Sequence, residues 1–256
     1  MERVIAVARG EVGYIEKASN SHLDDKTANP GSNNFTKYFR DLDRTDLYNG
    51  PKNGFAWCDG FVDWDFMTAY DFDTMVAMTY QELGGLGAGC TYSMNYYRAA
   101  GAFYDYPEVG DQCFFSSDGW VTSYHTGLVV GVSNGMIYTI EGNTSGEPGV
   151  VANGGMVAEK SYPISWAKYG RPNYSLVEGK TFGKEDENMT GEQIYNKLNE
   201  YLMGKPAPDW AQKELEEAKK MGITDGENMC ALTPRYQAAI MAKRAVEADR
   251  RGGKLF

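Results

Sequence analysis

The sequence of 256 residues has only two histidines and four cysteines, and it lacks a long apolar run. Cysteines at positions 58, 90, 113 and 230 are too widely spaced for a disulfide framework or a zinc site, so we expect reduced thiols and a protein made in the cytoplasm. No apolar stretch approaches the roughly 20 residues that span a membrane, so we expect no membrane insertion. Residues 1–9 become charged too early for a signal peptide.

Basic residues are also scarce in the first part of the chain. Residues 1–178 contain 12 Lys and Arg against 22 Asp and Glu, whereas residues 179–256 contain 13 of each, so the net charge of −10 arises entirely in the first part. An acidic surface repels phosphate groups, and the sequence has no basic stripe. We therefore expect neither nucleic acid nor an anionic lipid surface as a partner.

The apolar patterns predict an α+β domain over residues 1–178. Helical spacing and strand-like alternation predict helices at 2–18, 57–70, 74–83 and 94–100, and strands from 112 to 174. The polar segment 19–54 is expected to be irregular. Within it, Asp41–Asp46 has an incomplete calcium-loop spacing, and a solvated turn or a helix start is the more common structure for such a run.

The composition changes after residue 174. A charged, glycine-containing linker is predicted at 179–189, followed by a small all-α module at 190–256. The signals for this module are a capping box, a second N-cap and a proline in a first helical turn. These signals, at Thr190, Asp209 and Pro234, predict helices at 190–203, 209–221 and 234–250.

Asn134-Gly135 lies between two apolar runs, which is a strong hairpin signal. Two loop lengths are compatible with this signal. In a two-residue loop, Val132 pairs with Ile137, and the side chains of His125 and Glu141 point to opposite faces. A one-residue slip sends every side chain of a strand to the other face, so the loop length decides which polar groups meet.

In a three-residue loop, Ser133-Asn134-Gly135, Gly127 faces Glu141 and His125 faces Asn143. One face of the hairpin is then apolar and the other carries these polar residues, whereas the shorter loop mixes the two kinds of side chain. We therefore predict the three-residue loop, with a helix packed on the polar face, where glycines leave room for it.

A thiol, an imidazole and a carboxylate are the groups from which a cysteine hydrolase is assembled. Cys58 is predicted at the start of its helix, where unpaired N–H groups and the helix dipole stabilise a thiolate. His125 is placed to take and return the proton, and a carboxylate or an amide on the same face of the hairpin would orient the ring. Each residue alone has a common structural role, but their order and register together favour catalysis. No function is assigned to His22, Cys90 or Cys113.

These residues resemble the CHAP family, papain-like cysteine amidohydrolases and peptidases that cut bacterial peptidoglycan. The resemblance extends over most of residues 1–174 and lies in four segments, Phe55–Trp64, Pro107–Phe115, His125–Val129 and Ile140–Asn143. It implies a papain-like fold, with helices packed on an antiparallel sheet. It implies neither a metal nor a cofactor.

The resemblance also assigns roles to individual residues. Cys58 is the nucleophile, His125 the general base and acid, Glu141 the residue that orients His125, and Asn143 a supporting polar group. Asp65 is a departure, since relatives often have a less polar residue there, and it could perturb the packing of the helix.

The segment from Asp209 to Ala245 resembles one repeat of an S-layer homology module, although Tyr236 replaces the acidic residue that usually follows the arginine. By this resemblance, the module is a wall anchor, a homo-oligomerisation element or a spacer. A wall hydrolase without a signal peptide and with such a module resembles a phage or prophage endolysin. That resemblance implies action on peptidoglycan after release through a membrane lesion made by another protein.

The sequence does not decide which bond is cut. The two alternatives are the amide between N-acetylmuramic acid and L-alanine, and a bond within the stem or bridge peptide. Two other functions are also open, a non-catalytic wall-binding protein and an amidase that acts on small substrates. Trp57, Trp120 and Tyr124 are candidate walls of a substrate groove, with core packing as the alternative for each.

Overall fold

The structure is a computed structural model that describes residues 1–180, 195–196, 199 and 212–220. The chain divides into two compact units, Met1–Gly183 and Lys184–Phe256. In the second unit, α7 (Gln212–Lys220) lies within the helix predicted at 209–221, and residues 195, 196 and 199 are helical. The helix predicted at 234–250 lies outside the described residues, as does most of the predicted linker.

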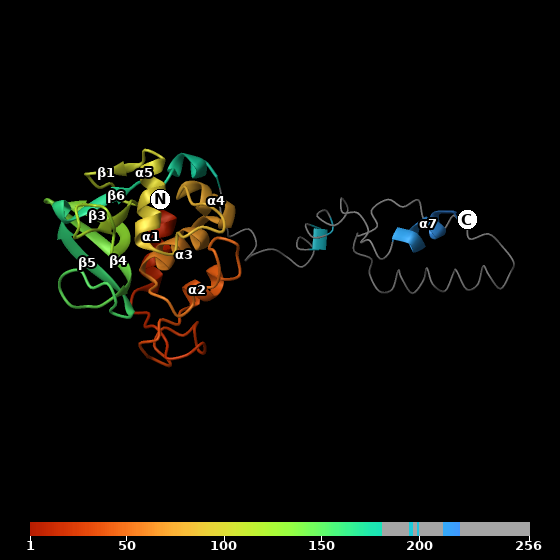
Figure 1. Ribbon diagram of the computed structural model, residues 1–256, viewed down its shortest axis with the longest axis horizontal. Coiled ribbons are helices and arrows are strands. Elements are labelled where there is room, and N and C mark those ends of the chain that lie inside the picture. The colour runs from red at the N-terminus through yellow and green to blue at the C-terminus, as the bar shows by residue number, and fades with distance from the viewer. Residues whose placement is uncertain (181–194, 197–198, 200–211, 221–256) are drawn as a thin grey trace. The chain divides into compact units, whose positions relative to one another are not determined.

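The first unit combines helices with one antiparallel sheet, which confirms the α+β class. Its helices are α1 (Glu2–Glu11), α2 (Lys37–Leu42), α3 (Cys58–Tyr70), α4 (Phe72–Met78) and α5 (Cys90–Ala99). Its strands are β1 (Phe103–Tyr104), β2 (Gln112–Phe115), β3 (His125–Ser133), β4 (Met136–Thr144), β5 (Met156–Pro163) and β6 (Ala167–Gly170). Figure 1 shows the long strands β3 to β5 on one side of this unit and α1 to α4 on the other. No helix among the described residues is long and apolar enough to cross a membrane.

Local capping explains where the structure departs from the predicted helices. α1 ends at Glu11 rather than at residue 18, since the backbone at Val12 is extended. α2 lies in the segment expected to be irregular, and the Thr36 side chain caps it by accepting a hydrogen bond from the backbone N–H of Phe39. Asp41 falls inside α2, where its carboxylate accepts a hydrogen bond from the indole of Trp64. The Asp41–Asp46 run is therefore a helix end, not an open loop.

The six strands are arranged in the order β1-β6-β2-β3-β4-β5, and every neighbouring pair is antiparallel. β3 and β4 form the predicted hairpin near the middle of the chain. β6, from the end of the unit, pairs with both β1 and β2, so this part of the sheet is held together by contacts between residues far apart in the sequence. His125, the first residue of β3, thus lies in an interior strand of the sheet.

The hairpin loop has two residues, so the prediction of a three-residue loop was wrong. Ser133 pairs with Met136, and Asn134 and Gly135 have φ values of +50° and +75°, as a type I′ turn requires. A β-bulge at Val130 then shifts the register by one residue. Beyond the bulge Leu128 pairs with Ile140, which is the register that the longer loop was expected to produce. The extra residue is in the strand, not in the turn.

The two faces of the hairpin carry separate clusters of buried side chains. Leu128 and Ile140 belong to the main core, together with Phe61, Val62 and other residues of the helices. The opposite face contributes to a smaller core, made of Cys113, Phe115, Val129, Ile137, Tyr162, Ala167 and Tyr169. α3 therefore packs on the apolar face, and the prediction that it packs on the polar face was wrong. The cluster on the helix side buries more apolar side chains than the cluster on the other face, so it contributes more to the stability of the fold.

Candidate active site

Cys58 is the first residue of α3, and the side chain of the preceding Trp57 makes no capping hydrogen bond. Backbone N–H groups in the first turn of a helix lack intrahelical acceptors, and that of Asp59 donates to the Cys58 sulfur. The pKa of the Cys58 thiol is held well below its ordinary value. The largest cause is a hydrogen bond from Cys90, and His125 adds to it, while burial acts in the opposite direction.

His125 lies fully buried at the first position of β3. Its Nε2 atom is 2.9 Å from Oε2 of Glu141, and its ring stacks on Phe115 with centroids 6.0 Å apart. Its Nδ1 atom makes no hydrogen bond of ordinary geometry within the described residues. Burial lowers the pKa of His125, but interaction with the Cys58 thiol and with Glu141 outweighs it and raises the pKa to about 9.

Glu141 is fully buried and accepts three hydrogen bonds. His125 and the hydroxyl of Tyr162 donate to Oε2, the latter over 3.1 Å, and the hydroxyl of Thr139 donates to Oε1 over 2.6 Å. Hydrogen bonds of this number satisfy the polar oxygens of a buried carboxyl group. Glu141 therefore holds the imidazole in one orientation and supports its positive charge.

Two glycines set the approach of these elements. A Cβ atom on Gly127 would lie 2.4 Å from Cγ of Glu141, so this glycine makes room for the glutamate. The expectation that it makes room for a helix was wrong. A Cβ atom on Gly142 would lie 2.5 Å from Cβ of Phe61 on α3. Consecutive residues thus serve opposite faces, since Glu141 reaches toward His125 while Gly142 lets α3 pack closely on β4.

The arrangement has the parts of a thiolate–imidazolium pair. Cys58 is the first residue of α3 and His125 the first of β3, and the interaction between their side chains lowers the pKa of the thiol and raises that of the imidazole. A lowered thiol pKa together with a raised imidazole pKa places the proton on His125 in the resting state. Such a pair can attack a carbonyl carbon through sulfur and then protonate the leaving group through the ring.

The sulfur opens onto a surface pocket of about 210 Å³. Its wall is formed by Ala56, Cys58, Ala88, Gly89, Cys90, Thr91, Tyr92, Ser123, Tyr124 and Ala152. Tyr124, predicted as a groove wall, lines it and is 46 % exposed, as is Tyr92, which the sequence analysis did not identify. The two tyrosines offer apolar ring faces to the pocket that Cys58 also lines.

No protein-family model and no curated protein matches this chain. The assignment of the site therefore depends on its geometry and on the motif residues. Among the described residues, no group of three or more His, Cys, Asp or Glu side chains could hold a metal ion.

Three predicted site residues lie elsewhere. Trp57 is fully buried, its indole N–H donates to Glu16, and its ring packs on Tyr38, so it does not line the pocket. Trp120 is half-buried and does not line the pocket either. Asn143 has a φ of +55°, and its side chain bonds to the loop at 152–155 rather than to His125. Asn143 was expected opposite His125 because side chains alternate between the two faces of a strand. Its left-handed backbone conformation interrupts that alternation.

Cys90 is the residue that the sequence analysis missed. Its sulfur lies 3.4 Å from that of Cys58, and the pKa of its thiol is raised well above the ordinary value, chiefly by its hydrogen bond to Cys58 and by burial. Gly89-Cys90 before an apolar helix indicates a cysteine in a first turn. The sequence contains no signal, however, that brings this turn to Cys58.

α3 also carries a buried carboxyl group without a partner. Asp65 is fully buried, and neither carboxyl oxygen has a hydrogen-bond partner in the described part of the chain. Burial, with a smaller contribution from Glu11, raises the pKa of Asp65 well above its ordinary value. The departure noted at this position is thus a polar group within the helical core.

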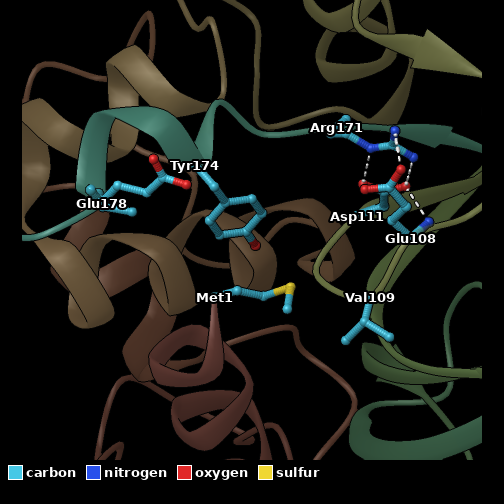
Figure 2. Close-up of a pocket in the computed structure, with 8 residues that line it drawn as sticks. Met1, Glu108, Val109, Asp111, Arg171, Tyr174 and Glu178 are labelled. Atoms are coloured by element: carbon cyan, nitrogen blue, oxygen red, sulfur yellow. Dashed lines mark hydrogen bonds and ion pairs between the residues drawn. The ribbon is translucent and has the colours of Figure 1, made fainter.

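A second pocket, of about 370 Å³, is drawn in Figure 2 and contains none of the residues discussed above as catalytic. Arg171 lies at its edge, where it forms ion pairs with Glu108 and Asp111 at 2.6 and 3.0 Å. The guanidinium charge of Arg171 is thereby matched by neighbouring carboxylates.

Proposed function

We propose that this protein is a CHAP-type cysteine hydrolase with a papain-like fold that cleaves an amide bond of bacterial peptidoglycan. The observation that carries the proposal is the Cys58–His125–Glu141 relay, in which the nucleophile begins a helix and borders an open pocket. A thiol that served only for packing would need neither a raised imidazole pKa nor a buried carboxylate behind the ring.

The proposed reaction uses these groups in turn. The Cys58 thiolate attacks the amide carbonyl carbon, and N–H groups in the first turn of α3 stabilise the developing oxyanion. The His125 imidazolium gives its proton to the leaving amine, which breaks the C–N bond and leaves an acyl–sulfur bond. Water then attacks the acyl carbon, His125 takes the water proton, and the thiolate is released.

The exposed rings of Tyr92 and Tyr124 support a polymeric substrate, since aromatic faces at a pocket rim bind sugar rings and peptide side chains. We further propose that the S-layer-like module anchors the enzyme to the wall. Action on the wall after release from the producing cell, as in an endolysin, completes the proposal.

The test is clearing of a suspension of Gram-positive cell walls by the full chain, followed by mass spectrometry of the products. We expect clearing, with complete loss in Cys58→Ala and His125→Ala. His22→Ala, which changes the only other histidine, in an exposed loop, is the matched control. Full activity of Cys58→Ala would overturn the mechanism.

The products distinguish the remaining functions. A free lactyl carboxyl group on muramic acid together with a free L-alanine amine indicates an amidase, whereas new termini within the stem or bridge peptide, with the lactyl amide intact, indicate an endopeptidase. Binding to walls without any product would indicate a wall-binding protein. Turnover of small amides but not of walls would indicate an amidase of another class, and either result would overturn the proposal.

A further inference from the structure

Cys58 and Cys90 form a closely spaced pair of free thiols. They begin two different helices, α3 and α5, and are 32 positions apart in the sequence, yet their sulfur atoms are 3.4 Å apart. A disulfide bond is about 2.05 Å long, so a small side-chain movement joins the two sulfurs. Cys113, the third free cysteine described, bonds instead to the carbonyl oxygen of Gly127.

One hydrogen bond joins the starts of the two helices, and two more join the start of α5 to the segment before His125. Ser93, one turn after Cys90, has its hydroxyl 2.5 Å from the carboxyl group of Asp59, the residue next to Cys58. Thr91 bonds to Ser123 in both directions, since its hydroxyl donates to the Ser123 carbonyl and accepts from the Ser123 N–H. These bonds fix the two cysteines before any oxidation, so closing the pair orders little additional chain.

Both cysteines are largely buried but border the same surface pocket. Cys58 and Cys90 are 5 % and 7 % exposed, and both line the 210 Å³ pocket. The two groups are chemically unequal: the low pKa of Cys58 makes it the attacking thiolate, while Cys90 keeps its proton. This is the arrangement of an attacking and a resolving cysteine.

We propose that Cys58 and Cys90 are a reversible modification site, which a low-molecular-weight disulfide converts into an intramolecular disulfide that blocks the nucleophile. The Cys58 thiolate attacks one sulfur of the reagent, which forms a mixed disulfide and releases one thiolate. Cys90 then loses its proton and attacks the Cys58 sulfur, which forms the Cys58–Cys90 bond and releases the second thiolate. The two protein thiols are oxidised, and one reagent disulfide is reduced to two thiols.

The test is peptide mapping of the full chain after incubation with oxidised glutathione. We expect a Cys58–Cys90 linked peptide, loss of iodoacetamide labelling at both residues, and recovery of both by dithiothreitol. Cys90→Ser should instead accumulate glutathione on Cys58, and the matched control Cys230→Ser should behave as wild type. The wild-type map decides the outcome even if Cys90→Ser fails to fold.

Stable glutathione on Cys58 of the wild type, or two thiols that remain reduced, would overturn the inference. Only the inhibitory consequence depends on the proposed function. Since the readout is a covalent linkage and not activity, the linked peptide in a protein that cleaves no wall would reject the proposed function alone. Wall cleavage that survives full oxidation would reject the block of the nucleophile.

Discussion

The Nε2 atom of His125 lies 2.9 Å from Oε2 of Glu141, and this bond determines which ring nitrogen is left for Cys58. Because Nε2 is engaged by the carboxylate, Nδ1 is the ring nitrogen that remains for proton exchange with the thiol in the proposed mechanism. Hydrogen bonds from Thr139 and Tyr162 hold the carboxylate in place. The imidazole is therefore oriented before any substrate binds.

Replacement of this carboxylate tests the orientation. We expect Glu141→Gln to lower kcat/KM for wall cleavage by about 10²-fold, since an amide does not support the imidazolium charge. Glu159→Gln, an exposed position on β5, is the matched control and should keep wild-type activity. Equal kcat/KM in Glu141→Gln and wild type would reject a role for the carboxylate.

The two altered pKa values predict the pH dependence of activity. The pKa of the Cys58 thiol is held well below its ordinary value, and His125 keeps its proton until about pH 9. We expect kcat/KM to fall as pH rises through about 9, where the imidazolium loses the proton that the leaving amine needs. A pH–rate profile that is flat across this range would contradict the ion-pair mechanism.

Cys90 is expected to tune the nucleophile. Its hydrogen bond is the largest cause of the lowered Cys58 pKa, so Cys90→Ala should move the pH profile of iodoacetamide labelling at Cys58 to higher pH. His125→Ala should shift the profile in the same direction, since it removes the second cause. Cys230→Ala serves as the control, and an unchanged profile in Cys90→Ala would show that the sulfur contact does not stabilise the thiolate.

The close approach of α3 and β4 predicts a steric effect at Gly142. A methyl group there would lie 2.5 Å from Cβ of Phe61, so Gly142→Ala should lower the free energy of unfolding by about 1–3 kcal/mol. Gly146→Ala is the matched control, because no atom lies within 4 Å of its added Cβ. Urea unfolding of both variants measures the difference, and equal stabilities would mean that the helix is not packed against β4 at this point.

Asp65 predicts a pH-dependent change in stability. In the unfolded chain its carboxyl group ionises near its ordinary pKa of 3.8, whereas burial raises the pKa in the folded chain. Unfolding therefore releases a proton between these two pKa values, and the native state loses stability as pH rises through this window. At acidic pH, the free energy of unfolding of Asp65→Asn should be similar to that of wild type. Across the window, the variant should become more stable than wild type by about 1.4 kcal/mol for each unit of pH.

Urea unfolding at several pH values tests this expectation. The exposed Asp46→Asn is the control, since no buried carboxyl group is changed by it. Equal pH slopes in Asp65→Asn and wild type would mean that Asp65 is ionised in the native state.

The register of the hairpin shows what the sequence pattern could predict and what it could not. Alternation of apolar and polar residues predicted that Gly127 faces Glu141, and in the structure Leu128 pairs with Ile140 and the Glu141 side chain lies against Gly127. The pattern could not show where the extra residue lies, because an insertion in the turn and a bulge at Val130 give the same register beyond it. The turn prediction failed for this reason, while the pairing next to the site survived.

The sequence by itself determined the α+β class, the helix that begins at Cys58, and the relation of Glu141 to the His125 strand, because periodicity, capping and strand alternation are local properties. Only the tertiary structure decided which hairpin face meets α3, that Trp57 is in the core, and that Cys90 lies against Cys58. These contacts join segments that are far apart in the chain. They depend on how the apolar side chains of the whole unit pack together and on where glycines allow two elements to approach closely. A thiol pair formed by two separate helix starts has no local pattern from which it could be read.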